Sequence, residues 1–283
     1  MQDGHTVTNS RSAAILVVLF ASLPVVVAGC GPQAYMKPDT FTPWVKPVDR
    51  PTVRFTPPRV SSVEIGSSVK GNKIMLYQFG TSGPSTLIFG AIHGDEPTSG
   101  HVARQLLELL RSDASLYRYR QVSIVTVANP DGLSKRTRAN ANGVDCNRNF
   151  PSRNWKRTAR NSATYGGATP ASEPETRAII RAVERLAKCD RIVSIHSIRN
   201  SKQCNNFDGP GKKLAELMTA SNGYPPKGSI GYPTPGSFGT WAGVEKKIPT
   251  ITLELPRSAS PQQAWNNNRK ALLAVIQHPQ LAK

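Results

Sequence analysis

Three short apolar runs in this chain each end on a side chain that could bind a metal ion or move a proton. These side chains are His93, with Glu96 three residues later, then His196, and finally Glu254. Two imidazoles and one carboxylate are the donors of many catalytic zinc sites, which leave the fourth position to water. A further carboxylate beside such a site could serve as general base and acid. The pattern therefore favours metal-assisted hydrolysis.

The other histidines are poor candidates for the same site. The chain has five histidines, of which His5 lies in an amino-terminal leader and His278 follows the last predicted helix. His101 falls in the middle of a predicted helix, five residues after Glu96, and so faces away from the turn. By elimination His93 and His196 form the only pair at predicted strand ends.

Each of these residues, taken alone, also has a structural interpretation. Asp95 and Glu96 could cap the positive amino end of the next helix. A single histidine at a strand end is more often structural, and Glu254 could pair with a cation. A glutamate inside the apolar segment 250–255 would, however, be buried at a cost without a purpose. Their joint occurrence at three strand ends favours the metal centre.

The elements that must position these residues alternate along the chain. The patterns predict strands over residues 63–65, 73–78, 86–92, 122–128, 191–195 and 249–253, and helices over 97–111, 173–187, 211–221 and 261–277. The first two strands form a predicted hairpin, and residues 222–239 a predicted loop. Asn129-Pro130-Asp131-Gly132 predicts a turn, and Ser172 with Glu175 predicts a capping box.

This alternation predicts the fold class and the place of the site. It favours one α/β domain with a mixed, mainly parallel central sheet and helices on both faces. In such sheets the sites gather at the carboxyl ends of the strands.

The segment from Arg138 to Phe150, Arg-Ala-Asn-Ala-Asn-Gly-Val-Asp-Cys-Asn-Arg-Asn-Phe, identifies a family. Together with His-x-x-Glu, Asn-Pro-Asp-Gly, Ser-Ile-His-Ser and Leu-Glu-Leu, it resembles the zinc carboxypeptidases of the carboxypeptidase A type. These motifs stand in the family's order from about residue 65 to residue 274, which is nearly the whole predicted domain. The resemblance implies a zinc carboxypeptidase-like fold and a zinc metallocarboxypeptidase or amidase activity.

The resemblance also implies the centre of the site. His93, Glu96 and His196 would bind one zinc ion, and Glu254 would be the general base and acid. The physical chemistry agrees, since zinc lowers the pKa of a bound water and polarises a carbonyl. A carboxylate in a partly dry site can take the proton of that water and return it to the leaving amine.

The resemblance gives three further residues a role in substrate binding. Arg138 would stabilise the oxyanion, because its charge is permanent. Asn147 and Arg148 would hold the terminal carboxylate of the substrate, for which a guanidinium beside an amide is a suitable grip. A surface position is the alternative for either arginine in so basic a chain.

Other segments resemble one branch of the family, the bacterial murein-peptide amidases (MpaA-like). They are His-Gly-Asp-Glu, Ala-Ser-Glu-Pro-Glu-Thr and residues 231–241. Enzymes of that branch cleave the γ-D-glutamyl–diaminopimelate bond of peptidoglycan peptides. Digestive-type members place an arginine where this chain has Asp95, and a mobile tyrosine over the leaving residue. Tyr232 lies near that place and is assigned to substrate binding, although its spacing to the next Gly-Ser differs.

The sequence leaves alternatives for the substrate and its pocket. We expect the specificity pocket to use Ser237, Phe238 and Gly239. The alternatives are a general zinc carboxypeptidase that removes C-terminal residues from peptides, and a zinc deacylase of the succinylglutamate desuccinylase or aspartoacylase type. A wall-binding lipoprotein without activity would have lost a ligand or the final glutamate, and none is lost.

The amino end predicts a location in the bacterial cell envelope. An uncharged run over residues 13–27 leads to Val27-Ala28-Gly29-Cys30, which resembles a lipobox with Cys30 as lipid anchor. This predicts a lipoprotein signal peptide over residues 1–29, a proline-rich tether over 30–60 and a catalytic domain over 61–283. Gly31 favours the outer membrane in enteric-type bacteria, on the periplasmic face. An ordinary secretory signal is the alternative.

The charge of the chain indicates an anionic partner. With 36 Lys and Arg against 18 Asp and Glu, the formal net charge is +18. The chain has no RNP-type aromatic cluster, zinc finger or basic helix, so nucleic acid is not expected. Besides Cys30 there are Cys146, Cys189 and Cys204, which allow at most one disulfide whose pairing the sequence does not fix.

Overall fold

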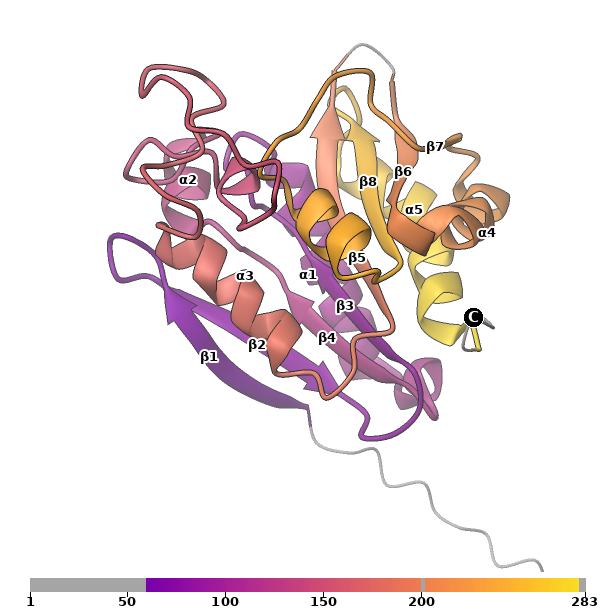
Figure 1. Cartoon of the computed structure of the whole chain (residues 1–283). Coiled ribbons are helices and arrows are strands. Elements are labelled where there is room, and N and C mark those ends of the chain that lie inside the picture. Colours follow the sequence, from indigo (N-terminus) through magenta and orange to yellow (C-terminus); the bar gives the residue numbers. More distant parts are fainter. Residues whose placement is uncertain (1–59, 200–201, 280–283) are drawn as a thin grey trace, which may run out of the picture. The chain divides into compact units, whose positions relative to one another are not determined.

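Eight strands form one mixed sheet in the computed structural model, which describes residues 60–199 and 202–279 (Figure 1). Across the sheet the order is β1 (Ser61–Ser67), β2 (Lys73–Phe79), β4 (Gln121–Val125), β3 (Ser85–Phe89), β5 (Arg191–Ile198), β8 (Thr250–Pro256), β6 (Cys204–Asp208) and β7 (Pro226–Lys227). The four central strands β4, β3, β5 and β8 are parallel. β2 and β6 pair antiparallel with the two sides of this group. The predicted fold class is confirmed.

Helices cover both faces of the sheet. The helices α1 (Pro97–Ser112), α4 (Lys212–Asn222) and α5 (Pro261–Gln277) pack on one face, and α3 (Pro174–Glu184) with the π-helical segment η4 (Gly239–Glu245) packs on the other (Figure 1). Shorter helices are η1 (Ala114–Tyr117), α2 (Pro130–Lys135), η2 (Cys146–Arg148) and η3 (Gly209–Gly211). In the central strands successive side chains enter opposite cores, as with Leu87 and Ile88.

The boundaries of several elements differ from the predicted ones for local reasons. The strand β3 ends at Phe89, not at residue 92, because the chain turns away at Gly90 and Ala91 adopts a φ of 52°. The predicted turn at Asn129 is the beginning of α2, where the Asn129 side chain accepts a hydrogen bond from the Gly132 amide. β5 and β8 continue past His196 and Glu254, which therefore lie within strands.

One prediction around these elements is wrong, and one strand was missed. Ser172 does not cap α3, whose N-cap residue is Glu173. The Ser172 hydroxyl instead donates to Glu173 and accepts from the side chain of Asn149. The strand β6 was not predicted, because Cys-Asn-Asn-Phe-Asp lacks an apolar alternation, and its place in the sheet comes from antiparallel pairing with β8.

The predicted signal peptide, the lipid anchor Cys30 and residues 31–59 of the tether lie outside the described residues. Within the described part, no helix is long and apolar enough to cross a membrane. The cysteines there are unpaired, and Cys146 is fully buried in one of the two cores.

Candidate metal centre and active site

The loop that carries His93 and Glu96 is held tightly against the start of α2. Backbone amides of Ala128 and Asn129 donate to the carbonyls of Gly90 and Ala91. A Cβ atom on Gly94 would overlap the backbone of Gly132. The local sequence therefore fixes the loop from both ends, and its two side chains project together beyond β3.

The other two central residues are brought together by strand pairing. β5 and β8 are parallel neighbours, and their register places His196 directly beside Glu254. Paired residues in a sheet point to the same face. Since β5 also pairs with β3, all four side chains reach one point at the carboxyl edge of the sheet.

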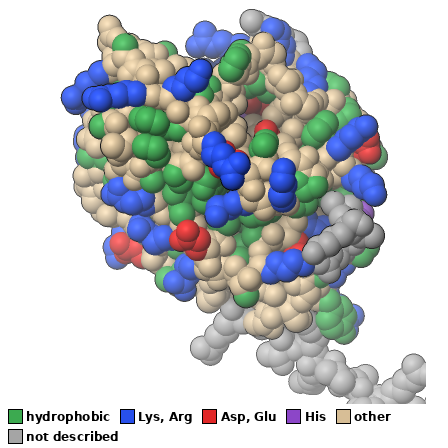
Figure 2. Space-filling view, viewed as in Figure 1, with side chains coloured by type: hydrophobic (Ala, Val, Ile, Leu, Met, Phe, Trp, Pro, Cys, Tyr) green, Lys and Arg blue, Asp and Glu red, His purple; other side chains and the backbone are tan. Residues whose placement is uncertain are grey.

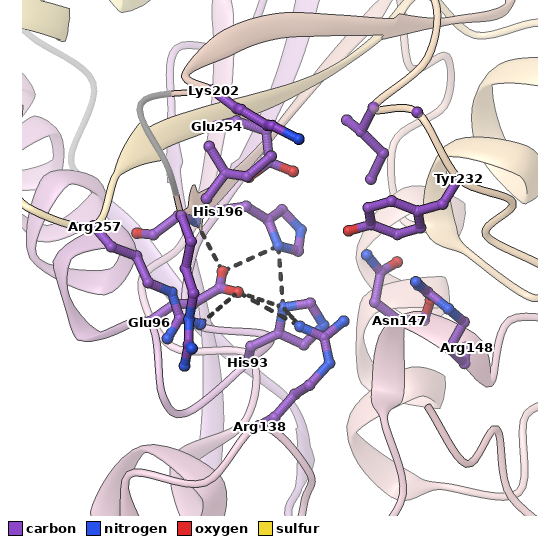
Figure 3. Close-up of a pocket in the computed structure, with 15 residues that line it drawn as sticks. His93, Glu96, Arg138, Asn147, Arg148, His196, Lys202, Tyr232, Glu254 and Arg257 are labelled. Atoms are coloured by element: carbon purple, nitrogen blue, oxygen red, sulfur yellow. Dashed lines mark hydrogen bonds and ion pairs between the residues drawn. The ribbon is translucent and has the colours of Figure 1, made fainter. Parts of the chain in front are cut away.

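Three of these side chains converge as a metal centre would require (Figure 3). His93 Nδ1 lies 3.0 Å from Glu96 Oε1 and 3.2 Å from His196 Nδ1. His196 Nδ1 lies 3.2 Å from Glu96 Oε2, and the donor atoms all fall within 4.8 Å of one another. All three residues are buried.

The charge state of these donors fits a bound cation. Burial alone would raise the pKa of Glu96, but the two histidines outweigh it and hold this pKa well below its usual range. Burial lowers the pKa of His196, so its ring is neutral and can donate a lone pair. Burial opposes the charge on His93 too, yet Glu96 and Asp145 raise its pKa to about 9. Without a metal ion His93 therefore carries a proton, which a zinc ion would displace on binding.

Asp145 is a site residue to which the sequence assigned no role. It is buried, and its Oδ1 lies 3.1 Å from His93 Nε2, the ring nitrogen that faces away from the metal donors. Its other oxygen accepts from Arg138 Nε at 2.9 Å. A carboxylate behind a ligating histidine fixes the tautomer and orientation of the ring. Asp145 therefore positions both His93 and Arg138.

We expect Asp145→Asn to weaken zinc binding by about 10- to 100-fold, because the His93 ring loses its carboxylate partner. Competition with a chromophoric chelator measures the change. The exposed Asp113 offers a matched control, Asp113→Asn, which should bind zinc as the wild type does. Equal zinc affinity in Asp145→Asn and the wild type would contradict this role.

Arg138 reaches the centre from its rim. Its side chain is 30% exposed, and its Nη1 lies 3.4 Å from His93 Nδ1 and 3.7 Å from Glu96 Oε1. A guanidinium in this place can meet negative charge that develops on a substrate beside the metal.

Asn147 and Arg148 have side-chain hydrogen-bond donors that no carboxylate of the described residues accepts. Asn147 Oδ1 accepts from the Phe238 amide at 2.9 Å, so the amide nitrogen of the side chain is left for a ligand. Arg148 is only 5% exposed and donates to the Asn147 carbonyl, and no ion pair joins it to an acidic residue in the described part. Burial lowers the pKa of this guanidinium. Asp145 attracts this guanidinium without forming an ion pair with it, and a buried cation that lacks a direct carboxylate partner indicates a site for an anionic group.

All eight residues predicted for the site within the described part line one cavity of about 390 Å³. Tyr232, 53% exposed, points into it opposite Glu254 (Figure 3). Glu254 is buried, and burial, reinforced by Glu96, raises its pKa to about 8. Arg199, Lys202 and Arg257 complete the cationic lining.

Arg257, which directly follows β8, adds a cation beside the metal donors. Its Nη2 lies 2.8 Å from Asp95 Oδ2 and 3.5 Å from Glu96 Oε1. Asp95 therefore holds this guanidinium next to the Glu96 carboxylate. Arg257 was not predicted as a site residue, because nothing in its local sequence distinguishes it from the other basic residues, of which the chain has 36.

The residues predicted for the specificity pocket lie in two different places. Ser237 and Gly239 line a second cavity beside the first. Phe238 does not line it but is buried in the core, edge-on to Phe89 at a ring distance of 4.8 Å.

Comparison with known proteins agrees with this geometry. A sequence profile described as zinc carboxypeptidase matches residues 52–201. Murein peptide amidase A of Escherichia coli K12 is 35% identical over 189 residues, which cover 63% of this chain and 74% of that protein. Murein peptide amidase A of Vibrio campbellii is 30% identical over 232 residues, which cover 77% and 88% of the two chains.

Solved structures show the same fold. The murein-tripeptide amidase MpaA from Escherichia coli O157 superposes with a TM-score of 0.65 at 31% identity, covering 78% of this chain and 94% of that one. Bovine thrombin-activatable fibrinolysis inhibitor reaches a TM-score of 0.66 at 21% identity, covering 77% and 88%, and so supports the fold alone.

Proposed function

Since the chain belongs to the zinc carboxypeptidase family, a family of hydrolases, we propose that it cleaves the γ-D-glutamyl–diaminopimelate bond of peptidoglycan peptides. The observation that carries the proposal is the buried Arg148 beside Asn147, which makes no direct ion pair with a described residue and lies in the same cavity as the metal donors and Glu254. It calls for a substrate whose leaving residue bears a free carboxylate. The substrate class is supported by the two amidases that are 30% and 35% identical to this chain.

In the proposed reaction each residue acts through the contacts described above. Zinc held by His93, Glu96 and His196 would lower the pKa of a water molecule and polarise the scissile carbonyl. Glu254 takes a proton from the attacking water and returns it to the leaving amine. These steps need a carboxylate beside the metal donors, and Glu254 is paired with His196 across β5 and β8 and lines the cavity.

The remaining residues bind and orient the substrate. Arg138 meets the negative charge that develops on the carbonyl oxygen. Arg148 and the amide nitrogen of Asn147 hold the carboxylate of the leaving residue, and Tyr232 covers it from the exposed side of the cavity. Binding of the substrate carboxylate thus holds the scissile amide next to Glu254, and this fixed orientation contributes to the rate.

We place this reaction in the bacterial cell envelope, on the periplasmic face, with Cys30 as the lipid anchor. The sequence at residues 27–30 supports the anchor. The net charge of +18 would keep the domain near an anionic wall or membrane surface. Figure 2 shows that Lys and Arg side chains are spread over the visible face and do not form a single patch.

The proposal predicts that the zinc-loaded protein releases diaminopimelate from L-Ala-γ-D-Glu-diaminopimelate. The Glu254→Gln variant should release it at least about 100-fold more slowly at the same protein concentration, whereas Glu108→Gln, a change at an exposed residue of α1, should act as the wild type does. Chromatography of the free amino acids gives the rate. If only ordinary α-peptides lose their C-terminal residue, the protein is a general carboxypeptidase. If only acyl-amino acids react, it is a deacylase.

A further inference from the structure

A second cavity, of about 170 Å³, opens from the active-site cavity. The two cavities share Asn147, Ile230, Tyr232 and Glu254 as walls. Because Asn147 is a proposed carboxylate ligand and Glu254 faces the scissile bond, the side chain of a leaving residue would point toward this second cavity.

The two cavities differ sharply in charge. Five cationic residues line the first: Arg138, Arg148, Arg199, Lys202 and Arg257. No Lys or Arg is among the described residues that line the second, whose charged groups are the carboxyl groups of Asp208 and Glu254. The second cavity therefore favours a positively charged group.

Strand pairing places the acidic group at the far end of this cavity. In the antiparallel ladder of β6 and β8, Asn206 lies opposite Thr252 and Asp208 opposite Thr250. Because side chains alternate along a strand, Asn206 and Asp208 face the same side of the sheet as Glu254. Thr250 precedes Glu254 on β8, so Asp208 lies deeper along the sheet than the catalytic carboxylate. Asn147 and Asp208 line the same cavity of about 170 Å³, so a leaving residue held at Asn147 would extend its side chain toward Asp208.

Two acceptors in the cavity lack partners in the described part of the chain. Asn206 is 8% exposed, and its Oδ1 is buried without a hydrogen bond. The Asp208 carboxyl has no ion pair or hydrogen bond to a described residue, and burial raises its pKa to about 6. A Cβ on Gly239 would overlap this carboxyl, so glycine leaves it room. A buried acceptor without a partner, as Asn206 Oδ1 is, beside a partly buried carboxyl group without an ion pair indicates a missing donor.

We propose that the second cavity binds the side-chain ammonium group of the leaving residue, with Asp208 as its counter-ion and Asn206 Oδ1 as a second acceptor. The inference rests on the proposed function, because it takes the leaving residue to be the one held by Asn147 and Arg148. Diaminopimelate and lysine both carry such an ammonium group. The Ser237 hydroxyl also lines the cavity; its oxygen accepts from the Thr234 hydroxyl and the Thr240 amide, so its own hydrogen could be donated to the second carboxylate of diaminopimelate.

The test compares three peptides, L-Ala-γ-D-Glu-X, in which X is diaminopimelate, lysine or norleucine. Norleucine keeps the aliphatic chain of lysine and lacks its ammonium group. We expect the wild type to show a kcat/KM at least about tenfold higher for the first two peptides. Asp208→Asn should lower kcat/KM for these two by about 10- to 100-fold more than for the norleucine peptide, since a charge-assisted bond is lost. Glu216→Gln, an exposed change on α4, is the matched control and should keep the wild-type ratios.

Each outcome decides one of the two proposals. Equal rates on all three peptides in the wild type, or an equal loss on all three in Asp208→Asn, would overturn the ammonium site and leave the amidase function standing. If no γ-linked peptide is cleaved, the amidase function fails, and the site is then tested by calorimetric binding of free lysine and norleucine to the zinc-loaded protein. Tighter binding of lysine that is lost in Asp208→Asn would support the site, and equal binding would refute it.

Discussion

The Glu254→Gln variant should retain its zinc and lose hydrolysis by about 10²- to 10⁴-fold in kcat. Glutamine keeps the volume and shape of the side chain at a buried position beside His196, so the metal donors should be undisturbed. It cannot take a proton from water, and no other carboxylate within the described residues lies free beside the centre, because Glu96 and Asp145 are held by His93. Metal analysis and initial rates on the same preparation measure both properties.

The pKa of Glu254 predicts how kcat/KM varies with pH. Only the carboxylate form of Glu254 accepts a proton, so kcat/KM of the wild type should rise with pH through the pKa of this group. Burial and Glu96 raise this pKa to about 8, and a zinc ion nearby would lower it again. The acid limb should therefore lie between the ordinary value of 4.5 and about 8. A Glu254→Gln variant that keeps wild-type kcat and the same acid limb would exclude Glu254 as the base.

The His196→Ala variant should lose tightly bound zinc, and with it all measurable hydrolysis. His196 is the only metal donor supplied by β5, and its removal leaves His93 and Glu96, both from one loop, as the described donors. Three protein ligands are the usual minimum of a catalytic zinc site. After dialysis against buffer without metal, the zinc content should fall from one ion per chain to near zero.

The control for this variant is His278→Ala, which removes a partly exposed imidazole at the end of α5. It should keep both zinc and activity. Full zinc occupancy in His196→Ala, measured by atomic spectroscopy, would refute the assignment of the metal ligands.

The centre of the site was predictable because its residues are marked by local pattern. Each of His93, His196 and Glu254 follows or ends an apolar run, and parallel strands must bring such ends to one edge. The same alternation of strands and helices predicted the fold class. Both signals are carried by residues close together in sequence.

What escaped prediction depends on contacts between distant segments. Asp145 supports His93 across 52 positions, and Arg257 reaches Asp95 across 162. Asp208 lies on a strand that has no apolar alternation and is defined by its neighbour β8. The Ser172 cap failed for the same reason, because Asn149, from a distant loop, competes for its hydroxyl.

The contact of Gly94 with Gly132 has a consequence for metal exchange. Because the backbones of Gly94 and Gly132 pack against each other, the loop that carries His93 and Glu96 adopts its conformation on folding, before a metal ion binds. The binding energy of zinc is then not spent on arranging its ligands, which favours high affinity from only three side chains. Because the site is preorganised, the bound zinc should be removable by a chelator and replaceable by zinc or another divalent ion without unfolding of the protein.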